Sequence, residues 1–153
     1  MDCMSVGRNF GILNRRTQLY ITNCCRQWRI SYSEYVLLEQ LYVTEGITQD
    51  ELAALLYIDK AMVARGLKSL EEKGYLYRLK GERDKRQKTI RLTVKARNIE
   101  AVFHDVVLQW LKRITVTMSE TDLQRMLDDL REVTKNAAEA DLNLKESDEG
   151  DAL

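Results

Sequence analysis

Residues 48–93 read TQDELAALLYIDKAMVARGLKSLEEKGYLYRLKGERDKRQKTIRLT, and this stretch decides the fold. Its first helix is expected to begin at the capping residue Thr48, and its second runs from the capping residue Asp59 to Gly74. Two short segments of alternating residues follow, separated by a charged loop at 81–88. This order predicts a helix-turn-helix followed by a β-hairpin wing, an arrangement typical of DNA binding.

The second helix of this stretch has two different faces. Its apolar residues recur at helical spacing and predict a buried face made of Val63, Leu67 and Leu70. The opposite face is small and basic, as entry into a DNA major groove requires, because bulky or acidic side chains would block entry or repel phosphate. We therefore expect DNA contacts from Lys60, Ala61, Ala64, Arg65 and Lys68.

The loop of the wing is rich in cations. Arginine suits a narrow minor groove, because its flat cation fits the strongly negative cleft. Asp84 is unusual in a loop that faces phosphates, and we expect it to orient Arg86 or another arginine by a paired hydrogen bond. The expected DNA contacts of the wing are Arg83, Lys85, Arg86 and Lys88.

The net charge of the 153-residue chain is zero, but its local charges are strong. Residues 59–97 hold 13 Lys and Arg against 5 Asp and Glu, a net charge of +8. Residues 139–153 hold 6 acids against Lys145, a net charge of −5, and we expect the tail from 141 to be disordered. Because binding follows the local field, overall neutrality does not argue against a nucleic-acid partner.

Amphipathic helices are expected on both sides of the deciding stretch. One runs over residues 5–28, one from Thr93 to about 117, and one from Ser119 onward. A capping box also predicts a helix start at Ser31, whereas within the deciding stretch Leu52, Leu55 and Leu56 are expected to form a buried side. The first helix is too long to bury its apolar stripe on a small winged helix. We expect it to pack on other long helices or on a second subunit.

Composition and motifs exclude several classes of protein. The chain has no apolar run long enough to span a membrane, its N-terminus lacks the apolar core of a signal peptide, and its three cysteines fit a reducing cytoplasm. It also lacks a nucleophile–base pair, a phosphate-cradling glycine loop and a pair of isolated carboxylates, so we expect neither an enzyme nor a cofactor. The single His104 favours a surface or interface histidine over a metal ligand.

Two further sets of side chains have alternative interpretations. Aromatic residues at helical spacing usually belong to a core, but here they could also line an effector cleft: Trp28, Tyr32, Tyr35, Phe103 and Trp110. A cysteine that senses oxidants needs exposure and a lowered pKa. Cys24 lies on an apolar stripe and is expected to be buried, whereas Cys25 is next to Arg26, which would favour the thiolate.

Asp84-Lys85-Arg86 form a D-x-R motif, which Ile90, Leu92 and Thr93 follow in the pattern apolar-x-L-T. With this motif, the sequence resembles the MarR (multiple antibiotic resistance regulator) family of winged-helix repressors over roughly residues 8–140. Ala61 and Ala64 depart from the family, whose members often carry Ser or Thr there. Gly66 within the helix allows close approach, either to DNA or to a neighbouring helix.

The resemblance implies a fold that is mainly α with a small β-hairpin wing, a winged helix-turn-helix flanked by long dimerisation helices. In one domain, residues 30–93 would bind DNA, 5–28 and 94–140 would form the dimer, and 141–153 would be the acidic tail. The resemblance also implies recognition helices in successive major grooves of double-stranded DNA. Many relatives are released from DNA by small aromatic ligands or by cysteine oxidation.

These features predict a homodimeric transcriptional repressor that binds a pseudo-palindromic operator. Its half-sites are expected about one helical turn, 10–10.5 bp, apart. The alternatives are a winged helix that docks an acidic protein, which the charge of +8 disfavours, and a redox-sensing regulator with the same fold.

Overall fold

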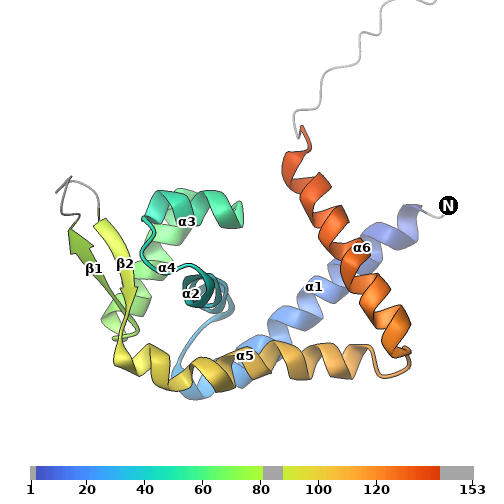
Figure 1. The fold of residues 1–153 in the computed structure, drawn as a ribbon, viewed down its shortest axis with the longest axis horizontal. Coiled ribbons are helices and arrows are strands. Elements are labelled where there is room, and N and C mark those ends of the chain that lie inside the picture. Colours follow the sequence, from blue (N-terminus) through green and yellow to red (C-terminus); the bar gives the residue numbers. More distant parts are fainter. Residues whose placement is uncertain (1–2, 81–87, 142–153) are drawn as a thin grey trace, which may run out of the picture. The chain divides into compact units, whose positions relative to one another are not determined.

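The computed structural model of the chain describes residues 3–80 and 88–141, except for the side chains of residues 3 and 4. It divides into two compact units, residues 1–114 and 115–153, which are described separately. In chain order (Figure 1), the elements are α1 (Cys3–Cys25), the 3-10 helix η1 (Arg26–Trp28), α2 (Tyr32–Val43), α3 (Gln49–Leu56), α4 (Lys60–Glu72), β1 (Leu76–Lys80), β2 (Lys88–Leu92), α5 (Val94–Ile114) and α6 (Glu120–Glu139). The chain is therefore mainly helical with one antiparallel hairpin, as predicted.

The helices begin at the capping residues that the sequence indicates. The Ser31 hydroxyl accepts the Glu34 N–H at 3.3 Å, and the Glu34 carboxylate accepts the Ser31 N–H at 2.7 Å. Thr48 forms the same box with Glu51. Asp59 accepts the N–H groups of Ala61 and Met62, and Ser119 caps α6. Each cap satisfies donors that an isolated helix leaves without partners, so helix starts were predictable from local sequence.

The core of the first unit lies where α2 packs against α4. Val63, Leu67 and Leu70 are fully buried, which confirms the predicted inner face of α4. A Cβ added to Gly66 would lie 2.5 Å from the Cδ1 atom of the buried Leu37. Gly66 therefore permits close approach to α2, and this contact decides between the two roles that the sequence allowed.

The predicted buried side of α3 is partly wrong. Leu52 is fully buried and Leu56 is half-buried, but 52% of Leu55 is exposed, and Ala53 is buried in its place. The short helix packs mainly against α4 and β2. Its buried side is therefore centred on residues 52 and 53. Helical spacing alone does not reveal this direction, because it depends on the neighbouring elements.

The hairpin has an inner and an outer face. In its register Leu76 lies opposite Leu92 and Arg78 opposite Ile90, so these four side chains share the inner face. Tyr77 and Leu79 lie on the outer face and are 44% and 45% exposed. The segment before α3 extends this sheet, because the Gly46 N–H donates to the Ile90 carbonyl and the Ile90 N–H donates to the Ile47 carbonyl.

The long helices carry apolar side chains that the structure leaves exposed. On α1 and α5 these are Val6, Phe10, Ile12, Leu13, Leu19, Val102, Val107, Leu108 and Ile114. Helix α5 ends at Ile114, slightly before the expected end near residue 117. Helix α6, considered by itself, has an apolar stripe and no buried residue. These stripes agree with the expectation that the long helices have further packing partners.

Candidate nucleic-acid interface

The outer face of α4 is exposed and basic. Lys60, Ala61, Arg65 and Lys68 are exposed, and Ala64 is half-buried. The ammonium of Lys60 lies 3.3 Å from Asp50, and that of Lys68 lies 3.9 Å from Glu72. Both pairs are mostly exposed to solvent, so they are weak and leave the cations available to an anionic partner. The cations and the two alanines of this face are the residue types expected on a helix that enters a major groove.

Three contacts hold the far end of α4 in place. The Lys73 ammonium lies 2.6 Å from the buried Glu34 carboxylate at the start of α2. The Glu71 carboxylate pairs with Arg78 of β1 at 2.7 Å. The Thr93 hydroxyl donates to the Gly74 carbonyl at 2.7 Å and accepts the Ala96 N–H at the start of α5. Helix α4 is thus attached to α2, to the hairpin and to α5, which fixes the direction of its exposed face.

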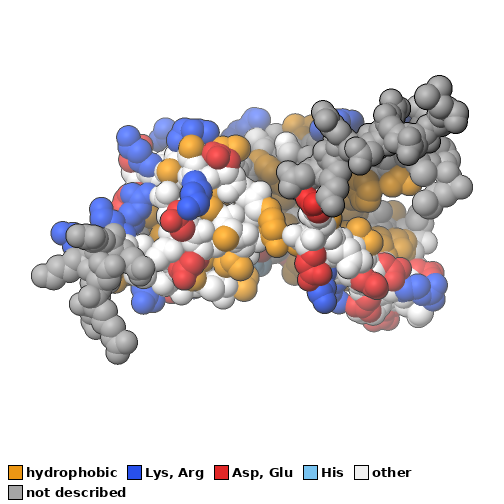
Figure 2. Space-filling model, turned by 90° about the horizontal axis from the view of Figure 1, so that it is seen from above, with side chains coloured by type: hydrophobic (Ala, Val, Ile, Leu, Met, Phe, Trp, Pro, Cys, Tyr) orange, Lys and Arg blue, Asp and Glu red, His pale blue; other side chains and the backbone are white. Residues whose placement is uncertain are grey.

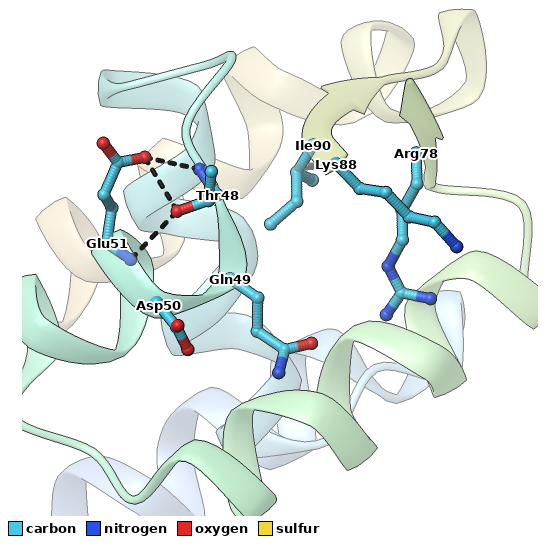
Figure 3. Close-up of a pocket in the computed structure, with 7 residues that line it drawn as sticks. All are labelled: Thr48, Gln49, Asp50, Glu51, Arg78, Lys88 and Ile90. Atoms are coloured by element: carbon cyan, nitrogen blue, oxygen red, sulfur yellow. Dashed lines mark hydrogen bonds between the residues drawn. The ribbon is translucent and has the colours of Figure 1, made fainter. Parts of the chain in front are cut away.

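A hollow of about 630 Å³ separates the first turn of α3 from the hairpin. Figure 3 shows Arg78 and Lys88 on the hairpin side and Gln49 and Asp50 on the α3 side. Lys88 is exposed, as expected for a DNA contact, whereas Arg78 is three-quarters covered and paired with Glu71. Arg78 is one of the cations of the basic segment at 59–97, and no role was predicted for it from the sequence. The only hint in the sequence of its pairing was Glu71, an acidic residue seven positions before it.

Basic side chains gather at the left of Figure 2, the end at which the hairpin of the first unit lies. Of the wing residues expected to bind DNA, only Lys88 falls within the described part of the chain. The other wing positions, Arg83, Asp84, Lys85 and Arg86, lie outside the described residues, so their roles stay predictions.

The candidate effector aromatics form two separate groups. Phe103 is fully buried and packs against Trp28 at 5.7 Å and Tyr35 at 4.5 Å between ring centroids. Trp110 instead stacks on Tyr20 at 4.9 Å and donates to the Thr17 hydroxyl. Tyr32 is half-buried at the edge of the core.

Two buried polar atoms lie beside the first of these groups. The Tyr35 hydroxyl and one Glu39 carboxylate oxygen are buried close to each other, and among the described residues no third group bonds to either atom. Burial raises the pKa of Tyr35, and the nearby Glu39 charge raises it further, so the phenol stays neutral.

The burial of the two adjacent cysteines is the reverse of the expectation. Cys25 is fully buried and Cys24 is only half-buried, because the end of α1 turns Cys25 toward α2. Burial raises the pKa of the Cys25 thiol to about 12, and the Cys24 and Glu39 charges contribute further. Cys25 therefore lacks the thiolate character of a sensor. The side chain of Cys3 lies outside the described residues.

His104 joins α5 to α2. Its Nδ1 atom lies 3.1 Å from Glu39 and its Nε2 atom 3.8 Å from Glu100. Within residues 3–80 and 88–141, no three His, Cys, Asp or Glu side chains are grouped as a metal site would require. No helix in those ranges is long and apolar enough to cross a membrane.

Comparisons with known proteins agree with this geometry. The MarR family model matches residues 30–88, from the start of the second helix to the hairpin. The regulator SarZ of Staphylococcus epidermidis is 28% identical over 116 residues, which cover 75% of this chain and 77% of SarZ. A MarR transcriptional regulator from Methanosarcina mazei Go1 superposes with a TM-score of 0.85 and 25% identity, covering 89% of this chain and 98% of that one.

A MarR-family regulator from Listeria monocytogenes, crystallised with a 26mer DNA, superposes with a TM-score of 0.81 over 86% of this chain and 88% of its own. At 20% identity this likeness concerns the fold alone. The order of elements, the helix-turn-helix with its hairpin, and the matches in sequence and structure lead to one conclusion. Residues 30–88 match the MarR family model, and these findings together support a winged-helix transcriptional regulator of the MarR type.

Proposed function

We propose that this regulator is a cytoplasmic repressor that binds a specific double-stranded operator as a homodimer. The observation that carries the proposal is the exposed face of α4, which is small, basic and fixed to the core at its far end by Lys73. Contacts from this face would read base edges, while neutralised phosphates would supply much of the affinity. Blocking of polymerase at the operator is the simplest form of repression.

The proposed DNA contacts come from two elements. In the major groove, α4 would use Lys60, Ala61, Ala64, Arg65 and Lys68. In the flanking minor groove, the wing would use Arg83, Lys85, Arg86 and Lys88, with Asp84 orienting an arginine. The alanines would make apolar contacts and leave room for the helix, so most of the hydrogen bonding falls to the cations.

A homodimer accounts for the exposed apolar stripes. Several apolar residues on the long helices are each more than half exposed: Phe10 and Leu19 on α1, Val102 and Leu108 on α5, and Leu130 and Val133 on α6. Large exposed apolar surfaces mark association sites in soluble proteins. In this proposal, residues 30–93 bind DNA and the helices at 5–28 and 94–140 join two copies. Two-fold symmetry would then require a pseudo-palindromic site with half-sites about 10–10.5 bp apart.

A small aromatic ligand is the proposed signal for release. The support is the cluster of Trp28, Tyr35 and Phe103, beside which the Tyr35 hydroxyl and a Glu39 carboxylate oxygen lie buried close to each other. Tyr32 borders this cluster, whereas Trp110 belongs to a separate contact with Tyr20. A phenolic ligand placed there would contact both α2 and α5, and would so change the spacing of the two recognition helices.

Selection of bound duplexes from a random pool tests the proposal directly. We expect the bound sequences to share an inverted repeat, and Arg65→Ala and Arg86→Ala to weaken binding of the selected duplex without changing the fold or the dimer. An unfolded Arg65→Ala variant would instead indicate a structural role for that side chain. The proposed function would be contradicted if the selection recovers no common sequence and the protein also fails to bind random duplex.

A further inference from the structure

Tyr57 occupies a backbone position that favours glycine. It follows α3 with φ 53° and ψ 38°, in the left-handed region. Its N–H donates to the Ala54 carbonyl at 3.3 Å, and the Ile58 N–H donates to the Ala53 carbonyl at 3.1 Å. This pair of bonds is the Schellman ending of a helix, in which the left-handed residue is usually Gly and sometimes Asn. A tyrosine there is strained, because its Cβ approaches the following carbonyl.

The folded chain gains little from this tyrosine. Its side chain is 74% exposed, and within the described residues its hydroxyl makes no hydrogen bond. The backbone bonds that end α3 need no side chain at this position. Residues held in such strained conformations cluster at functional sites. The remaining question is what the ring and hydroxyl of Tyr57 meet.

The position of the turn answers this question. Tyr57 is two residues before Asp59, the N-cap of α4, and Lys60 of the first turn of α4 pairs with Asp50 of α3. The N-terminal part of a recognition helix is the part that reaches the bases. A side chain on the turn that leads into this part would face the sugar-phosphate backbone at the edge of the same groove.

We propose that the Tyr57 hydroxyl donates a hydrogen bond to a DNA phosphate beside the entry point of α4. This inference rests on the proposed DNA-binding function and adds a contact to it. Tyrosine hydroxyls are among the groups that position proteins on DNA through phosphates. A phosphate carries no sequence information, so Tyr57 would contribute affinity and orientation equally on all sequences. Because the donor is neutral, it would not add to counterion release.

The experiment compares Tyr57→Phe, which removes only the hydroxyl, with Tyr57→Asn, which also relieves the backbone. The full-length chain is titrated against a selected duplex and a random duplex at several salt concentrations. We expect both variants to bind about tenfold more weakly, the loss of one good hydrogen bond. The loss should be the same on both duplexes, with an unchanged dependence on salt, and the midpoint of thermal unfolding of Tyr57→Asn should not fall.

Two controls separate strain from contact. Arg29→Asn relieves the other non-glycine residue at positive φ in the described chain, at 58° after η1, and should leave the affinity for the selected duplex unchanged. Leu55→Ala truncates another exposed side chain of α3 and should also bind normally. If Tyr57→Phe binds like the wild type while Arg65→Ala binds weakly, the Tyr57 contact is refuted and the proposed function stands. If Arg65→Ala is also unaffected, both fail.

Discussion

Replacing Lys73 with methionine should destabilise the protein far more than an ordinary surface change. The Lys73 ammonium lies 2.6 and 2.7 Å from the two carboxylate oxygens of Glu34. The Glu34 side chain is 5% exposed and that of Lys73 is 28% exposed. Burial by itself would raise the pKa of Glu34, but hydrogen bonds from Lys73, Ser31 and Ser69 outweigh it and hold the pKa below its ordinary value.

The size of the effect follows from the burial of Glu34. Removing the ammonium leaves a buried carboxylate without its countercharge, which costs about 3 kcal/mol of the free energy of unfolding at neutral pH. For a chain of this length, that loss corresponds to a thermal midpoint lower by about 6–12 °C. Methionine retains most of the apolar stem of Lys73, so the change isolates the charge.

The pH dependence gives this prediction its sign. In the wild type the pKa of Glu34 is lower in the folded than in the unfolded protein. The pair of Glu34 and Lys73 therefore stabilises the fold fully above the ordinary glutamate pKa, near 4.3. This stability is lost as the pH falls through the pKa that Glu34 has in the folded protein. In Lys73→Met the hydrogen bond from the ammonium is lost and only those from Ser31 and Ser69 oppose burial, so the pKa of Glu34 should rise. Protonation then relieves the penalty as pH falls, and the gap between the two proteins should narrow in acid.

Urea unfolding followed by circular dichroism at pH 7 and pH 4.5 measures both effects. Lys68→Met is the matched control, because Lys68 lies on the same helix and its pair with Glu72 is mostly exposed. The double change Glu34→Gln with Lys73→Met should recover part of the loss. If Lys73→Met is as stable as Lys68→Met, or if the difference in stability from the wild type does not narrow in acid, Lys73 does not stabilise the fold by neutralising Glu34.

Three further changes test other parts of the fold. Gly66→Ala gains about 1 kcal/mol of helix propensity but loses about 1–3 to the clash with Leu37, so the urea midpoint should fall; a rise would show that Leu37 moves aside easily. Thr48→Ala removes the cap of α3 and should cost about 1 kcal/mol in the same assay, whereas an unchanged midpoint would contradict the role of the cap. Alkylation mapped by mass spectrometry should modify Cys24 before Cys25, whose buried thiol has a pKa of about 12; rapid modification of Cys25 in the folded protein would overturn its assignment as inert.

The elements that local sequence encodes were predictable. The caps at Ser31, Thr48 and Asp59 depend on residues within the same turn, and the structure confirms all three. The inner face of α4 was also predictable, because Val63 and Leu67 recur at helical spacing on a helix that packs on one side only. The same periodicity identified the exposed face on which the DNA-binding proposal depends.

Features that depend on the direction of tertiary contacts were not predictable. The alternation in β1 shows that two faces exist, but only the register with β2 shows that Arg78 lies on the inner one, paired with Glu71. Cys24 and Cys25 are adjacent, and the packing at the end of α1 decides which of them is buried. Leu55 is exposed for the same kind of reason, because the partners of α3 set the direction of its buried side.

The central claim is that the exposed face of α4 reads a DNA sequence. The most direct test is the ratio of the affinities for the selected duplex and for a scrambled duplex of the same composition, measured by fluorescence anisotropy at one physiological salt concentration. For the wild type we predict a ratio on the order of 10³ or more, and a clear fall in that ratio for Arg65→Ala. A ratio near one for the wild type, or the same ratio in both proteins, would contradict the claim.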